Sequence, residues 1–249
     1  MFRYILFFVI FVWCSFGYAQ VNIEGSRIQD KRGLTVAGDL GLDIKAGNTE
    51  VLELSTIGRI DHVTEKNHVL LLGEYERGEA QDELFKKSAL FHARNTYMFS
   101  WVGVEGFLQS QRNDFNDLSL RQLLGGGVRF EYKKKTAKNK LLVALGLGAM
   151  AEYEELLSQQ GEGWLSRSTN YVSVKHQFKE IITFYMVGYY QPKIQDVDDF
   201  RLLLDMGLEV KMVKKFSVVN SFILAYDSRP PIEVQNHDIG NSTRFKFTF

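Results

Sequence analysis

Apolar and polar residues alternate with a period of two along most of this chain. In residues 34–44 the even-numbered positions are apolar and the odd-numbered positions are mostly polar or small, and residues 118–132 and 200–212 show the same alternation. Successive side chains of a β-strand point to opposite faces, whereas helical spacing fits none of these segments. The pattern therefore predicts long strands that each carry one apolar face.

Polar clusters divide the sequence into about twelve such strands, and bacterial membrane barrels contain an even number of strands. Each segment is long enough for a tilted strand, which needs about 9–11 residues to cross the hydrocarbon core. Segments 97–110, 163–178 and 181–191 alternate less regularly than the others. We therefore expect an all-β fold, a single antiparallel transmembrane β-barrel over residues 33–249. The predicted strands are 33–45, 50–62, 67–78, 83–94, 97–110, 117–132, 140–154, 163–178, 181–191, 199–212, 215–227 and 238–249.

The chain starts with MFRYILFFVIFVWCSFGYAQ, in which Arg3 precedes an apolar stretch and Gly17-Tyr18-Ala19 forms a small-x-small site. This layout is typical of a cleavable secretory signal, and an N-terminal anchor helix is the alternative. We expect a signal peptide at residues 1–19 and a short lead at residues 20–32. Cys14 is the only cysteine, so the exported chain would contain no disulfide, and closed backbone hydrogen bonding is a candidate for what holds it together.

Composition narrows the function classes. The 249 residues include 30 Lys and Arg and 30 Asp and Glu, so the formal net charge is zero and nothing indicates a nucleic-acid partner. Apolar residues make up 45% of the chain and the mean hydropathy is slightly negative, which argues against a helical membrane protein.

The predicted connections between strands differ in charge. Barrels of this type place both termini and the short turns on the periplasmic side. The candidate periplasmic turns, EYKKKTAKNK, KHQFKE and KMVKKF, are rich in lysine, whereas the candidate outer loops, EYERGEAQDE, EYEELLSQQGEGW, PKIQDVDDF and PPIEVQNHD, are acidic. A soluble β-sandwich has no reason to sort its loops in this way.

If the apolar faces contact lipid, the opposite faces line the lumen with equal numbers of acids and bases. Unpaired charges are strongly disfavoured in a low-dielectric interior, so these side chains should form ion pairs or hold water. The balance favours a narrow lumen closed by salt bridges or a weakly selective pore, because a selective channel usually has a surplus of one sign. Gly125, Gly127, Gly146 and Gly148 could leave room for long arginine side chains. The predicted lumen charges are Asp39, Asp43, Glu53, Arg59, Glu74, Lys86, Glu105, Arg121, Arg129, Glu131, Arg201, Asp205, Glu209, Lys211, Arg244 and Lys246.

No motif indicates a catalytic, metal or cofactor site. The five histidines, His62, His68, His92, His176 and His237, form no short-range cluster with ligand spacing. His92 lies on the lumen side of its predicted strand, and a Ser–His pair on a barrel wall would suit a lipid hydrolase. Ser88 lies four residues earlier, which in a strand separates the two side chains by about 13 Å. We therefore predict no enzymatic activity and no cofactor.

Several segments together resemble one family. These are LGLDIKAGNTE, FSWVGVEGFLQSQRNDFNDLSLRQLLGGGVRFEY and the terminal FKFTF. They are similar to the outer-membrane family of domain of unknown function 481, also described as salt-induced outer membrane proteins, over roughly residues 32–249. The resemblance implies a barrel in the outer membrane of a Gram-negative-type bacterium, and it carries over no catalytic residue.

We interpret the chain as an outer-membrane barrel, structural or stress-related, with a narrow charge-balanced lumen or a small-solute pore. The alternatives are a membrane-embedded hydrolase that acts on lipid and a soluble secreted β-protein that binds lipid. The expected partners are outer-membrane lipid and the barrel assembly machinery. Phe245, Phe247 and Phe249 alternate with polar residues at the C-terminus and resemble the signal which that machinery recognises.

Overall fold

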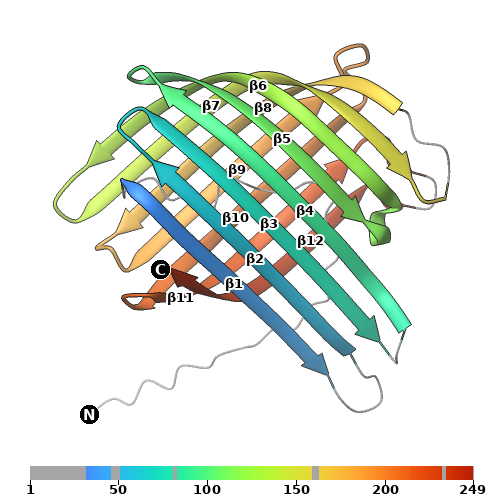
Figure 1. Ribbon diagram of the computed structural model, residues 1–249, viewed down its shortest axis with the longest axis horizontal. Coiled ribbons are helices and arrows are strands. Elements are labelled where there is room, and N and C mark those ends of the chain that lie inside the picture. Colours follow the sequence, from blue (N-terminus) through green and yellow to red (C-terminus); the bar gives the residue numbers. More distant parts are fainter. Residues whose placement is uncertain (1–31, 46–50, 81–82, 159–162, 232–233, 249) are drawn as a thin grey trace.

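A computed structural model describes residues 32–45, 51–80, 83–158, 163–231 and 234–248. These residues form twelve strands in one closed antiparallel barrel (Figure 1), which confirms the predicted fold. No helix in the described ranges is long and apolar enough to cross a membrane. The elements are β1 (Gly33–Lys45), β2 (Val51–Val63), β3 (Asn67–Ala80), β4 (Glu83–Met98), β5 (Val102–Asn113), the short 3-10 helix η1 (Asp114–Asn116), β6 (Leu118–Lys135), β7 (Asn139–Leu156), β8 (Gly163–Phe178), β9 (Ile182–Pro192), β10 (Phe200–Val213), β11 (Phe216–Asp227) and β12 (His237–Thr248).

Every strand pairs with its neighbours in sequence, and the first strand closes the barrel against the last. The β1–β2 ladder runs from Gly33 opposite Val63 to Lys45 opposite Val51. The closing β1–β12 ladder is shorter and pairs residues 37–40 with residues 245–248. Closure removes the free edges that an open sheet would expose, which is the condition for a sheet to span a membrane.

The two faces of the strands differ as the alternation predicts. In β1 the outward side chains of Leu34 and Leu40 are 67% and 51% exposed, whereas the inward Thr35 and Ala37 are 3% and 5% exposed. Large apolar side chains are exposed on the outer surface of every strand except β11. A soluble protein would bury this much apolar surface, and a membrane barrel presents it to lipid.

The connections at the two ends of the barrel also differ. Turns 64–66, 99–101, 136–138, 179–181 and 214–215 lie where β1 begins and β12 ends, and we call this the turn end. The connections that follow odd-numbered strands lie at the opposite end, called the loop end. The described residues of the lysine-rich segments lie at the turn end, and those of the acidic segments lie at the loop end. The predicted sorting by charge is therefore present in the barrel.

One predicted boundary was wrong. The polar run Arg94-Asn95-Thr96 suggested a turn after residue 94, but β4 continues to Met98 and the turn is Phe99-Ser100-Trp101. Arg94 and Thr96 instead point inward and are buried. The turn Phe99-Ser100-Trp101 contains no Gly or Asn, the residues that usually signal a turn. Its aromatic residues are of the kind that is enriched at membrane–water interfaces.

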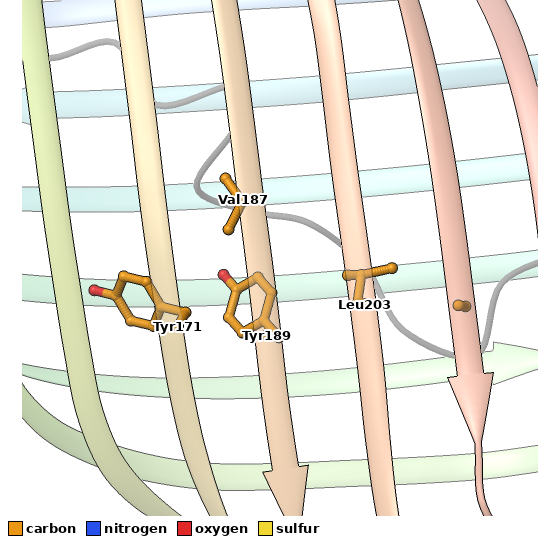
Figure 2. Packing of buried hydrophobic residues seen from close by; sticks show 5 residues of the cluster. Tyr171, Val187, Tyr189 and Leu203 are labelled. Atoms are coloured by element: carbon orange, nitrogen blue, oxygen red, sulfur yellow. The ribbon is translucent and has the colours of Figure 1, made fainter.

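Side chains pack parts of the lumen. Tyr171, Val187, Tyr189 and Leu203 lie close together on β8, β9 and β10 (Figure 2), and Ala225 of β11 completes this cluster. A second cluster on β3 and β4 consists of Leu70, Leu72 and Leu90. Fully buried arginines occupy other parts of the interior. A wide aqueous channel would leave such side chains accessible to water.

Candidate functional site

The centre of the main lumen site is Glu152 of β7, whose side chain is completely buried. Three arginines from different strands bind its carboxylate. Arg121 of β6 donates through Nε to Oε1, and Arg201 of β10 donates through Nη1 to the same oxygen at 2.5 Å. Arg167 of β8 donates through Nε to Oε2 at 2.8 Å. Arg121 and Arg167 lie on the two strands next to β7, whereas Arg201 reaches Glu152 past the two intervening strands β8 and β9.

Further acids neutralise the three arginines. Arg201 also binds Glu154 through Nη2 at 3.1 Å and Asp227 through Nε at 2.7 Å. Arg167 binds Asp199 through Nη2 at 2.9 Å, which ties the connection between β9 and β10 to the barrel interior. We call this set the loop-end cluster, and its members are Arg121, Glu152, Glu154, Arg167, Asp199, Arg201 and Asp227.

The connection that supplies Asp199 is held by a second ion pair nearer the solvent. Arg229 donates to Asp196 with 2.6 Å between Nη1 and Oδ2. This hydrogen bond lowers the pKa of the Asp196 carboxyl, so the pair stays ionised at neutral pH. The pair therefore joins the connection between β9 and β10 to the connection between β11 and β12.

A second group, the central cluster, is organised by the hydroxyl of Tyr171. This hydroxyl lies 2.8 Å from Oε1 of Glu105 and accepts a hydrogen bond from Nη1 of Arg129 at 2.5 Å. Arg129 also binds Glu131 at 2.7 Å, and the guanidinium of Arg94 lies 5.7 Å from the centre of the Tyr171 ring. Tyr171 of β8 therefore joins side chains of β4, β5 and β6 across the lumen.

Glycines make room for the aromatic rings in the lumen. A Cβ atom added at Gly146 would lie 2.0 Å from Cε1 of Tyr171, and one added at Gly125 would lie 2.5 Å from Cζ of Phe107. The sequence predicts room for arginine side chains at Gly125, Gly127, Gly146 and Gly148. Aromatic rings instead lie over Gly125 and Gly146, and a Cβ atom at Gly127 or Gly148 would meet the backbone of the neighbouring strand. The rings cover the glycine backbone, an arrangement that stabilises strands with glycine.

Replacing Gly146 with Leu is expected to displace the Tyr171 ring, because the new side chain would occupy the space of the ring. Such overpacking costs about 1–3 kcal/mol of unfolding free energy. Chemical denaturation of the protein folded in lipid vesicles measures this change. Gly58→Ala is the matched control, since a Cβ atom there would meet nothing within 4 Å. Equal stability of the two variants would contradict the packing described here.

The remaining predicted charges lie in two other regions. Arg244 of β12 interacts electrostatically with Asp39, Asp205 and Glu74, and so connects β12 with β1, β10 and β3. Lys246 binds Glu209 at 3.0 Å. Nearer the turn end, Arg59 binds Asp61 through Nε at 2.6 Å, and His68 contacts the same carboxylate at 2.6 Å.

Four predicted lumen residues stand apart from these groups. Glu53 is half-buried on the inner side of β2, with Asp43 opposite in the β1–β2 register. The side chains of Asp43 and Lys86 lie outside the described residues. Lys211 is exposed near the turn end of β10 and does not line the lumen interior, because β10 ends two residues later.

Several important members of the site were not predicted from the sequence. Glu152 lies on the same side of β7 as Gly146 and Gly148, so its position in the alternation could have revealed it. Arg167 was missed because β8 alternates poorly, with polar Ser166 and Ser168 at positions that flank it on the outer face. Arg94 and Asp199 were missed because their partners, Glu105 of β5 and Arg167 of β8, come from other strands. Asp61 was missed although its partner Arg59 lies two residues away on the same strand.

A small recess at the loop end leads to the loop-end cluster. Its volume is about 50 Å³, and its apolar wall includes Leu118, Pro230 and Val234. A space of this size holds about four water molecules and is too small for an oligosaccharide. Five charged residues line the recess. Asp238 is one of them, and the other four, Arg121, Glu154, Arg201 and Asp227, belong to the loop-end cluster.

The Ser–His pair considered for a hydrolase does not form. The hydroxyl of Ser88 donates to Oε2 of Glu76 at 3.2 Å. His92 is buried, with its Nδ1 3.0 Å from Oε1 of Gln109 and its ring stacked on Phe107. Within the described ranges, no group of three or more His, Cys, Asp or Glu residues is arranged to hold a metal ion.

The C-terminal aromatic residues lie on the outer face of the closing strand. Phe245 and Phe247 are exposed, and both rings pack against Phe216 of β11, with centroids 6.0 and 5.2 Å away. Phe249 and the predicted signal peptide at residues 1–19 lie outside the described residues. Their roles therefore stay predictions.

Comparisons with known proteins agree with a barrel of the outer-membrane type. The family described as "Protein of unknown function, DUF481" matches residues 38–249. A structure of the NanC porin is 11% identical, with a TM-score of 0.50, and the match covers 87% of this chain and 99% of that chain. A structure of the KdgM porin is 14% identical, with a TM-score of 0.42 and coverage of 86% and 96%. LpxR from Salmonella typhimurium is 8% identical, with a TM-score of 0.48 and coverage of 86% and 99%. No curated protein matches the sequence. The likeness to these structures is one of fold.

Proposed function

We propose that this chain, which belongs to the family of unknown function DUF481, is an integral outer-membrane barrel whose lumen is closed by buried ion pairs. The observation that carries the proposal is the carboxylate of Glu152, which binds arginines from β6, β8 and β10 at once. An ion that passed along the lumen would have to separate these pairs. The desolvation of charges that have lost their partners makes this costly.

Placement in the outer membrane is supported by the apolar outer face and by the two different ends of the barrel. Short turns belong on the periplasmic side and longer loops on the outside, so the turn end would face the periplasm. After export, the protein should fractionate with the outer membrane and resist extraction without detergent. Its migration on a gel should change on heating, because the folded barrel is more compact than the unfolded chain. Recovery in the soluble fraction would instead support a secreted lipid-binding β-protein.

The closed lumen has a direct functional consequence. Vesicles that contain the purified protein should retain a trapped small solute as well as vesicles without protein do. The role in the envelope would then be structural, through the barrel itself and its surfaces. Release of the solute at a rate that rises with the amount of protein would contradict this conclusion.

A second candidate is a small-solute pore that opens when the loop-end cluster rearranges. The recess favours it, because it gives solvent at the loop end a path to Arg121, Glu154 and Arg201. In this case solute release should appear only under conditions that weaken the ion pairs, such as high salt or low pH. A lipid hydrolase has weaker support, since His92 and Ser88 are bound to other partners. If the protein hydrolysed lipid and His92→Ala abolished that activity, the hydrolase would become the better-supported candidate.

A further inference from the structure

Three consecutive connections at the turn end form one continuous strip. The backbone N–H of Lys179, between β8 and β9, donates to the carbonyl of Lys138, between β6 and β7, at 2.7 Å. The N–H of Lys211 in β10 donates to the carbonyl of Ile181 at 2.8 Å. The ends of β6 to β11 are therefore linked side by side along the edge of the barrel.

This strip carries a high density of positive charge. Eight lysines of the strip have exposed side chains, and we call six of them the basic rim: Lys134, Lys135, Lys138, Lys179, Lys211 and Lys214.

Nearby acids do not balance the basic rim. Glu131 is buried and binds Arg129 and Lys133, and Glu209 binds Lys246. Glu180 is exposed and lies in the turn between β8 and β9, so it offsets one of the positive charges of the rim. The rim therefore presents a net positive surface to whatever lies beside the turn end.

The positive charge is confined to one side of the barrel edge. The turn between β4 and β5 is Phe99-Ser100-Trp101, which is uncharged. In the turn between β2 and β3, Lys66 adjoins Glu65, whose carboxylate lies 3.5 Å from Arg32. A general solvation role for lysine would not concentrate it in a single sector.

Exposed apolar residues lie directly beside the basic rim on the outer face of the strands. Tyr132, Phe178 and Met212 are 59%, 42% and 60% exposed, and each lies within two residues of a lysine of the rim. A separation of two residues along a strand is about 7 Å. Lys134 and Lys214, each two residues from an exposed apolar side chain, can therefore reach a charged group above an apolar contact.

The backbone at Lys179 is unfavourable for lysine. The turn between β8 and β9 has positive φ values of 47° at Lys179 and 60° at Glu180, and the N–H of Ile181 bonds to the carbonyl of Phe178 at 3.0 Å. A turn with positive φ at both central residues favours Asn-Gly, because other L-residues are strained at positive φ. Strain of this kind is a reason to look for a function of the side chain.

We propose that the basic rim and the apolar residues beside it bind an anionic phospholipid of the adjacent leaflet. The lysine ammonium groups would contact the headgroup phosphates, and Tyr132, Phe178 and Met212 would contact the acyl chains. A lipid would use both the charges and the apolar surface. A soluble anion or an acidic protein would need only the charges, so the combination favours a lipid. The inference rests on the placement of the barrel in a membrane.

The test compares bound lipid in the full-length protein and in variants, purified in detergent and analysed by native mass spectrometry. Phosphatidylglycerol is the probe, phosphatidylethanolamine is the zwitterionic comparison without net charge, and glycerophosphoglycerol is the headgroup without acyl chains. Attraction to an anionic lipid surface corresponds to about fivefold in affinity per lysine. Lys134→Gln should therefore weaken phosphatidylglycerol binding by about fivefold, and the matched control Lys66→Gln should leave it unchanged.

A variant that combines Lys134→Gln, Lys138→Gln, Lys179→Asn and Lys214→Gln should lose most of its phosphatidylglycerol. Asn at position 179 tolerates the positive φ, so the turn keeps its shape. Full retention of the lipid in this variant, or equal binding of phosphatidylethanolamine by the unchanged protein, would overturn the proposal. Equal competition by glycerophosphoglycerol would also overturn it, in favour of a soluble anionic partner. A heat-modifiable band for each variant confirms that the barrel is folded, which separates a failure of this inference from a failure of the membrane placement.

Discussion

Replacing Glu152 with Ala is expected to lower the free energy of unfolding by about 3–5 kcal/mol, the cost of leaving buried charges without their partner. The carboxylate is the shared acceptor of Arg121, Arg167 and Arg201, and its side chain is fully buried. Denaturation of the protein folded in lipid vesicles measures the effect. The matched control is Glu155→Ala, because Glu155 is exposed on the same strand and its carboxylate contacts the Tyr153 hydroxyl.

A double-mutant cycle shows whether uncompensated charge causes the loss. Arg167→Met removes one of the three cations, so in the Glu152→Ala background it should destabilise the protein less than it does in the unchanged protein. Residues in one ion-pair network usually show coupling energies of about 0.5–3 kcal/mol. A stability of Glu152→Ala equal to that of Glu155→Ala would mean that the loop-end cluster does not hold the lumen closed.

Deleting Phe249 is expected to prevent insertion of most of the protein into the membrane. The prediction rests on the alternation of Phe245, Phe247 and Phe249 at the C-terminus. The first two rings lie on the outer face of β12, which closes the barrel against β1. Loss of the terminal aromatic residue would remove part of the expected assembly signal. The amount of heat-modifiable protein in the outer-membrane fraction measures insertion.

Lys246→Ala is the control for the deletion, since Lys246 lies in the same strand and points inward to Glu209. The substitution removes one ion pair and leaves the outward aromatic residues in place. It should therefore insert nearly as well as the unchanged protein. Equal insertion of the two variants would count against an assembly signal in the terminal phenylalanines.

The barrel could be predicted from the sequence because the residues of each strand alternate between apolar side chains that face lipid and polar or small side chains that face the lumen. Leu34 and Leu40 face outward and Thr35 faces inward, and this difference repeats every second residue. The prediction was weakest where the environment changes along a strand. Ser166 and Ser168 lie on the outer face of β8 near the loop end, where the surroundings become more polar, and the alternation is lost there.

The ion pairs could not be predicted in the same way, because strand alternation places a side chain in the lumen but does not identify its partner. Arg121 and Arg201 are 80 positions apart in the chain, yet both bind Glu152. The turn at Phe99-Ser100-Trp101 shows a related limit, since its aromatic residues match a membrane interface rather than any turn motif. The tilt of the strands and the closure of the barrel determine which side chains meet in the lumen and where each turn lies.

Single-channel recording in planar lipid bilayers tests the closed lumen most directly. The purified protein should insert without current steps at neutral pH and moderate salt, because the buried ion pairs of Glu152 and the hydrogen bonds of Tyr171 fill the lumen. Glu152→Ala should show steps under the same conditions, provided that its heat-modifiable band confirms folding. Stable current steps from the unchanged protein, present in every preparation and proportional to the amount inserted, would contradict a lumen closed by ion pairs.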